Sequence, residues 1–146
     1  MAHPPPRSVS NIPVLGCGWA FPVVRDRTRG DGASPLAMSA DDASVHNAVE
    51  IILSTRKGER VMRPTFGCDL SALLFSPNDS ATRATAAFET SEALRIWEPR
   101  IELLDVRVSA GGERGEMLLI EVDYRVLSTD NRFNLVYPFY LDRALV

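Results

Sequence analysis

IELLDVRV at residues 101–108 and MLLIEVDYRVL at residues 117–127 both alternate apolar with polar side chains. A period of two is typical of a strand that buries one face and exposes the other. The glycine-rich AGGERGE at residues 110–116 separates the two runs and can form a turn. The two runs therefore predict an antiparallel β-hairpin.

A third extended segment, NLVYPFYL, follows at residues 134–141. Pro138 cannot donate a hydrogen bond to a neighbouring strand, so it indicates a strand at a sheet edge or a bulge. The segment is unusually apolar, and a free edge exposes backbone groups with which another strand can pair. Ordinary packing over the core is one interpretation, and pairing with a partner protein is the sharper one.

A first helix is predicted upstream of the hairpin, starting near residues 39–42. Ser39 and Asp42 fit the S-x-x-D form of a capping box at its start. We expect its end at Lys57 and Gly58. One stripe along it carries the apolar residues expected in the core: Val45, Ala48, Val49, Ile52 and Leu53.

A second long helix is predicted to open at residues 77–79 and to stop at Pro99. Between the two helices, residues 59–75 predict an extended piece broken by Pro64, a turn at Gly67 and a short helical turn. The residues at helical spacing on the second helix are Ala84, Ala87, Phe88, Ser91, Leu94 and Trp97.

The N-terminal residues 1–12 are rich in proline and serine, which predicts a flexible arm before a single domain at residues 13–146. GCGWAFPV at residues 16–23 predicts a strand with two aromatic residues on one face. Large aromatic residues at periodic positions are usually core, and glycines admit a tight backbone path beside them. We therefore assign a scaffold role to Gly16, Gly18, Trp19, Phe21 and Trp97.

The order strand, helix, short helix, helix and then several strands predicts an α+β fold. We expect a small antiparallel or mixed sheet with helices packed on one face and a C-terminal edge strand. The length of 146 residues is enough for one hydrophobic core and too short for two ordinary domains.

The formal net charge is −3, and the 16 basic residues are spread along the chain without a basic run. Nucleic-acid and anionic-lipid surfaces need clustered positive charge, so we expect protein partners and no nucleic acid. No segment approaches the roughly 20 apolar residues of a membrane helix, and no signal-peptide core is evident. Neither membrane insertion nor self-directed export is expected.

Catalytic and metal-binding patterns are sparse. Cys17 and Cys68 are far apart, which predicts two buried free thiols in a reducing cytosol, with a disulfide as the alternative. His46 is expected to be a solvated or packed helical residue, so no catalytic pair, metal site or cofactor is expected. A glycosidase needs only two suitably spaced carboxylates, but no pair stands out.

Trp97-Glu98-Pro99-Arg100 lies at the junction between the second helix and the hairpin. Pro99 fixes the backbone, which holds the carboxylate of Glu98 and the guanidinium of Arg100 in a defined relation. These groups bind either each other or groups on another chain. A helix terminator flanked by two solvated charges is the alternative.

Several of these segments, in this order, resemble the lysozyme-named baseplate wedge proteins of contractile phage tails. That family also includes wedge components of type VI secretion systems and of extracellular contractile injection particles. The resemblance spans residues 16–141 and is carried by GCGWAFPV, ILSTRKGERVMRPTFGCDL, LLFSPND, RIWEPRI and NLVYPFYL.

The resemblance implies a sheath initiator that sits in the baseplate wedge around the tube, present in several copies. It implies contacts with other wedge subunits through Glu98, Pro99 and Arg100, and possible neighbours among tube or hub proteins. It also implies synthesis in the bacterial cytoplasm and incorporation into a particle that can act outside the cell. The strand that would accept the sheath protein comprises Leu135, Val136, Tyr137, Pro138, Phe139, Tyr140 and Leu141.

Two other classes of function compete with this structural role. The lysozyme name suggests a peptidoglycan hydrolase of the tail tip, although no catalytic pair is evident in the sequence. A regulatory anti-adaptor of proteolysis shares the same architecture, and a stable complex with a response regulator would favour that function.

Overall fold

A computed structural model describes residues 15–25 and 36–141. The predicted N-terminal arm and the last five residues of the chain lie outside these ranges. No helix in the described ranges is long and apolar enough to cross a bilayer.

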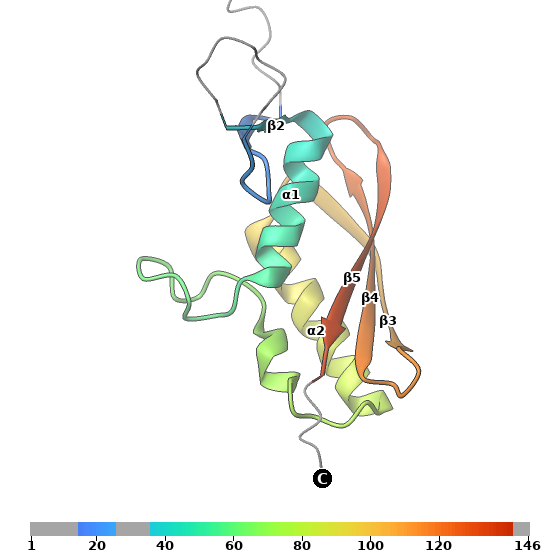
Figure 1. Cartoon of the computed structure of the whole chain (residues 1–146). Helices are drawn as coiled ribbons and strands as arrows, with labels where there is room; N and C mark the ends of the chain where they lie inside the picture. Colours follow the sequence, from blue (N-terminus) through green and yellow to red (C-terminus); the bar gives the residue numbers. More distant parts are fainter. Residues whose placement is uncertain (1–14, 26–35, 142–146) are drawn as a thin grey trace, which may run out of the picture.

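The main sheet has three antiparallel strands in the order β3-β4-β5 (Figure 1). Their bounds are Ile101–Gly111 for β3, Met117–Val126 for β4 and Arg132–Tyr140 for β5. The predicted hairpin is confirmed, because Val106 of β3 pairs with Val122 of β4. The predicted C-terminal edge strand is confirmed as well, because β5 pairs with β4 alone among the strands of the described residues.

Two helices lie on one side of this sheet, α1 (Asp41–Ser54) and α2 (Ser80–Trp97) (Figure 1). Every second side chain of β4 is buried beneath them, as the period of two requires. This confirms the predicted α+β class with helices on one face. The buried residues of β4 are Leu118, Ile120, Val122, Tyr124 and Val126.

The predicted capping box of the first helix is wrong. The N-cap of α1 is Ala40, which makes no side-chain cap, while Ser39 is buried in the short strand β2 (Met38–Ala40). Asp42 instead accepts hydrogen bonds from Thr129 at 3.1 Å and Asn131 at 2.7 Å. The first turn of α1 is therefore tied to the turn between β4 and β5.

The predicted apolar stripe of the first helix is largely confirmed, because Val45, Val49, Ile52 and Leu53 are buried. The helix ends earlier than predicted. Thr55 caps it, donating from both its N–H and its hydroxyl to the carbonyl of Ile51.

The second helix begins where the sequence indicates, with Asp79 accepting a hydrogen bond from the N–H of Thr82 at 2.8 Å. This bond lowers the pKa of Asp79. Of the residues predicted at helical spacing, Leu94 is buried and Trp97 packs against the core, whereas Ala84 and Phe88 are exposed. The face that packs is built from Leu94 and four small side chains, which allow close packing: Thr82, Ala86, Thr90 and Ala93.

The predicted helical turn between the helices is confirmed as the 3-10 helix η1 (Asp69–Leu73). Leu70 of this turn is buried in the core. The turn enters the core through Cys68, whose side chain is also buried.

The predicted N-terminal strand is shorter than expected. It comprises only β1 (Cys17–Trp19), which pairs with β2, and Phe21 lies beyond it in a bend. Trp19 is 66% exposed and Phe21 is also exposed, so the prediction that they are core residues is wrong. Within the described residues, this two-stranded ribbon has no second layer over the face that carries Trp19.

The loop that joins α1 to η1 is closed by its own backbone. Cys68 N–H donates to the carbonyl of Thr55 at 2.9 Å, and Gly58 N–H donates to that of Pro64 at 2.6 Å. Gly67, at the predicted turn, has φ of +108°, and a Cβ there would collide with the carbonyl oxygen of Thr55. The loop therefore requires glycine at this position.

Gly67→Ala should lower the free energy of unfolding by about 2 kcal/mol, because it adds a backbone clash to an unfavourable φ. Urea denaturation measures this loss. Gly18→Ala is the matched control, since its Cβ would meet open space at an ordinary φ, and it should change stability by less than about 0.5 kcal/mol. Equal effects of the two substitutions would contradict the role of Gly67.

Both cysteines are free, and only one of them is buried, which corrects the prediction of two buried thiols. Cys17 is exposed, whereas Cys68 is buried and its pKa is raised to about 11, chiefly by desolvation. In the native protein at pH 8, Ellman's reagent should modify Cys17 quickly and Cys68 only after unfolding, because the thiolate is the reactive form. The Cys17→Ser variant retains only Cys68, and fast modification of this thiol in the folded variant would contradict the prediction. The Cys68→Ser variant retains only Cys17 and is the control.

Candidate functional site

The Glu-Pro-Arg motif forms a closed pair at the end of α2. Glu98 caps the helix and is 2% exposed. The guanidinium of Arg100 donates two hydrogen bonds of 2.6 Å to the carboxylate of Glu98, one from Nε and one from Nη2. Of the two arrangements that the sequence left open, the structure therefore shows Glu98 and Arg100 binding each other.

Arg100 also holds the N-terminal segment. Its Nη1 donates to the carbonyl of Leu15 at 2.8 Å, while its own carbonyl accepts from Leu127 at 3.0 Å. The hydrogen bonds to Glu98 raise the pKa of Arg100 and outweigh the opposing effect of burial. Because Glu98 is enclosed, only Pro99 and the outer edge of Arg100 remain accessible to another protein.

The free edge of β5 is defined by two hydrogen bonds to β4. The N–H of Leu141 donates to the carbonyl of Glu116, and the carbonyl of Asn131 accepts from the N–H of Val126. The odd-numbered residues of β5 therefore direct their backbone N–H and C=O groups toward β4. The even-numbered residues direct theirs to the open side: Arg132, Asn134, Val136, Pro138 and Tyr140. The N–H that Pro138 lacks would lie on the open side, which explains why proline is tolerated there.

The side chains of β5 divide in the same way. Leu135 is buried, as is Leu141 directly after the strand, and Tyr137 and Phe139 pack against the core. Val136 and Tyr140 are exposed on the opposite face. Ordinary packing and a free surface therefore coexist in this segment, and only its even-numbered side chains remain available to a partner.

The C-terminal end of the predicted β5 site lies at the opposite end of the sheet from the Glu98–Arg100 pair. Ile101, next to the Glu98–Arg100 pair, is paired with the last residue of β4, where β5 begins. Tyr140 is paired with Met117 at the other end.

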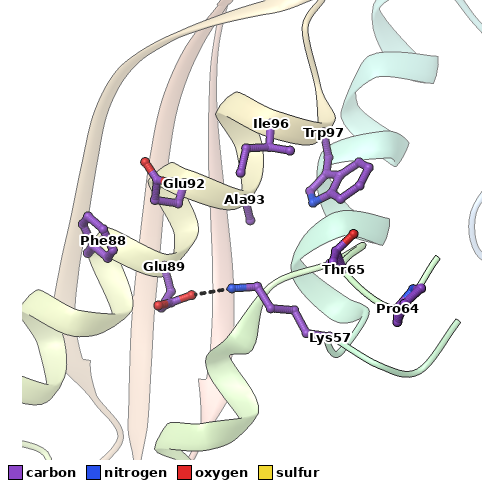
Figure 2. Close-up of a pocket in the computed structure, with 10 residues that line it drawn as sticks. Lys57, Pro64, Thr65, Phe88, Glu89, Glu92, Ala93, Ile96 and Trp97 are labelled. Carbon is purple, nitrogen blue, oxygen red and sulfur yellow. Dashed lines mark hydrogen bonds and ion pairs between the residues drawn. The ribbon is translucent and has the colours of Figure 1, made fainter.

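A groove that the sequence analysis missed runs between α2 and the loop of residues 55–67. Its volume is about 550 Å³, and the exposed side chains of Phe88 and Ile96 lie along one wall (Figure 2). Trp97 closes one end, its ring tilted against Phe66 with a centroid distance of 5.1 Å.

A family model described as baseplate wedge protein gp25 matches residues 39–131 of the chain. The baseplate wedge protein gp25 of Enterobacteria phage T4 is 43% identical over 65 residues, which are 44% of this chain and 49% of the phage protein. The match thus spans about half the length of that relative.

Two solved structures share the fold. A protein of Geobacter sulfurreducens, described as a candidate tail lysozyme, is 47% identical with a TM-score of 0.67, covering 73% of this chain and 96% of its own. A chain in the baseplate of the anti-feeding prophage is 19% identical with a TM-score of 0.60, covering 89% of both chains. The second likeness concerns the fold alone.

Arg100→Ala should lower the free energy of unfolding by about 3 kcal/mol, because it leaves the carboxylate of Glu98 buried without a counter-ion. The double variant Glu98→Gln/Arg100→Ala should regain part of that loss, since it removes the charge as well. Chemical denaturation of the three proteins measures both effects.

Arg125→Ala is the control, because the ion pairs of Arg125 with Glu102 and Asp130 lie at the surface. It should cost less than about 1 kcal/mol. A loss as small as this for Arg100→Ala would show that the Glu98–Arg100 pair does not hold the junction together.

Proposed function

The chain belongs to the gp25 family of baseplate wedge proteins, as the resemblance in its sequence indicated, and from this we propose that it is a structural subunit of the baseplate of a contractile injection system. It would be made in the bacterial cytoplasm and built, in several copies, into a particle that can act outside the cell. Its partners there would be other wedge subunits and the tube or hub.

The free edge of β5 is the observation that carries the proposed role in sheath assembly. Its open side offers backbone donors and acceptors at Asn134, Val136 and Tyr140, and the side chains of Val136 and Tyr140 are exposed beside them. A strand from a sheath subunit would extend the sheet by pairing with these groups. The subunit would thereby initiate the sheath at the baseplate.

The Glu98–Arg100 pair supports a wedge contact of a particular kind. Buried Glu98 acts from inside, holding the guanidinium of Arg100 and the turn at Pro99 in one position. The accessible surface of Pro99 and Arg100 would then meet a neighbouring wedge subunit as a preformed feature, which reduces the entropy lost on binding. Glu98 would position this contact without touching the partner.

Peptidoglycan hydrolysis is the rival function, because the Geobacter relative is described as a candidate tail lysozyme. Two carboxylates, Glu89 and Glu92, line the groove on α2. Glu89 is paired with Lys57 at 3.0 Å and Glu92 is exposed, whereas a catalytic acid needs a site that keeps it protonated. We therefore favour a non-enzymatic role, and zymography of the purified protein and of its Glu92→Gln variant tests it.

Val136→Pro should abolish co-purification of the sheath protein of the parent particle, because it removes an outward N–H and leaves the bonds between β5 and β4 in place. Binding of the other wedge subunits should persist. Circular dichroism must show that the variant is folded.

Val136→Thr is the matched control, since it keeps both the N–H and the branched shape, and it should bind the sheath protein like the wild type. Normal binding of the sheath protein to folded Val136→Pro would refute strand addition at β5.

A further inference from the structure

The loop of residues 55–67 presents two large apolar side chains to solvent. It protrudes from the helices on the side away from the sheet (Figure 1). Val61 is 94% exposed and Met62 is 90% exposed at its tip. Contiguous exposed apolar side chains commonly mark interaction sites, whereas single ones need no explanation.

Several contacts anchor this loop to α2. The guanidinium of Arg60 lies 4.1 Å from the ring centroid of Phe66, which packs in turn against Trp97. Lys57 forms an ion pair with Glu89 of α2, and this hydrogen bond raises the pKa of Lys57. The tip is thus held out by an anchored loop, and its exposure is part of the fold.

The α2 wall of the groove carries side chains at helical spacing. Phe88, Glu92 and Ile96 follow one another at four-residue spacing along α2. From Phe88 to Ile96 this stripe is about 12 Å long, which matches roughly two helical turns. Ala93 leaves room at the floor for a second helix to approach closely.

The loop beside the groove carries an excess of positive charge. The loop has four cationic residues and the single carboxylate of Glu59. Among the described residues, the guanidinium groups of Arg56 and Arg63 form no ion pair. The α2 wall presents Glu92 instead. A complementary partner therefore needs carboxylates on the flank that meets the loop.

We infer that this groove binds an amphipathic helix of a partner protein, with apolar side chains against Phe88, Ile96 and the Val61-Met62 tip. Acidic residues on one flank of that helix would pair with Arg56 and Arg63. This interface lies outside the β5 edge and outside the accessible part of the Glu-Pro-Arg motif. It does not depend on a role in sheath assembly.

Selection from a displayed library of random 16-residue peptides tests the inference. The full chain is the bait, and the double variant Val61→Ser/Met62→Ser is used for counter-selection. Enriched peptides should combine apolar residues at three- and four-residue spacing with an excess of glutamate and aspartate. The double variant and Ile96→Ser should each weaken a selected peptide by about tenfold.

Charge variants test the orientation. Arg63→Glu should weaken the same peptide, whereas Glu92→Gln should leave its affinity unchanged or raise it. Phe75→Ser is the matched control, because Phe75 is an exposed aromatic residue outside the groove, and it should have no effect. Thermal unfolding shows that each variant is folded.

The inference fails if no peptide is enriched that depends on the groove, or if the enriched peptides are basic. It also fails if the loop variants instead abolish sedimentation with phosphatidylserine vesicles, which would make the tip a membrane anchor. Loop-dependent dimerisation in analytical ultracentrifugation without peptide binding would replace the partner helix with a second copy of this chain.

Discussion

The ion pair between Glu98 and Arg100 is the interaction on which the rest of the structure depends. It joins the end of α2 to the start of β3, and through Leu15 and Leu127 it ties the N-terminal segment and the end of β4 to the same point. A buried carboxylate is costly unless every oxygen is satisfied, and here two guanidinium bonds satisfy it. The helical layer and the sheet are thereby fixed relative to each other at one end.

Period-two patterning was sufficient to predict the sheet, because one-sided burial leaves a direct record in each strand. The same logic succeeded only in part for α2. There the packed face combines small residues such as Ala86 and Thr90 with Leu94, whereas the bulky side chain of Phe88 is exposed. Ranking by size finds a buried stripe only where packing requires bulk, and a helix in close contact requires small residues instead. The prediction that Trp19 is a core residue was wrong because its short strand belongs to a separate two-stranded ribbon and not to the main sheet.

The candidate site was predictable in part. Glu98 and Arg100 are separated only by Pro99, which fixes the backbone between them. Their mutual pairing was therefore one of the two interpretations that the sequence allowed. Only the folded structure shows that Glu98 is enclosed, because burial at a helix end depends on what the rest of the chain places over it. The groove was out of reach, since its walls come from α2 and a loop that begins about 30 residues earlier, near Lys57. Such a separation leaves no periodic signal.

A subunit that offers a strand edge to another protein must avoid offering it to its own copies. The two edges of this sheet solve that problem differently. The β3 edge has a bulge between Leu103 and Asp105 and charged side chains, including Arg107, all of which disfavour a regular added strand. The β5 edge pairs without a register shift, carries Arg132 as its one charged residue, and has Pro138, which removes one donor from the open side. Two copies paired edge to edge would each lack that bond, whereas a partner strand can match the remaining groups. The single proline thus biases β5 against self-association while leaving it open to a strand of the right register.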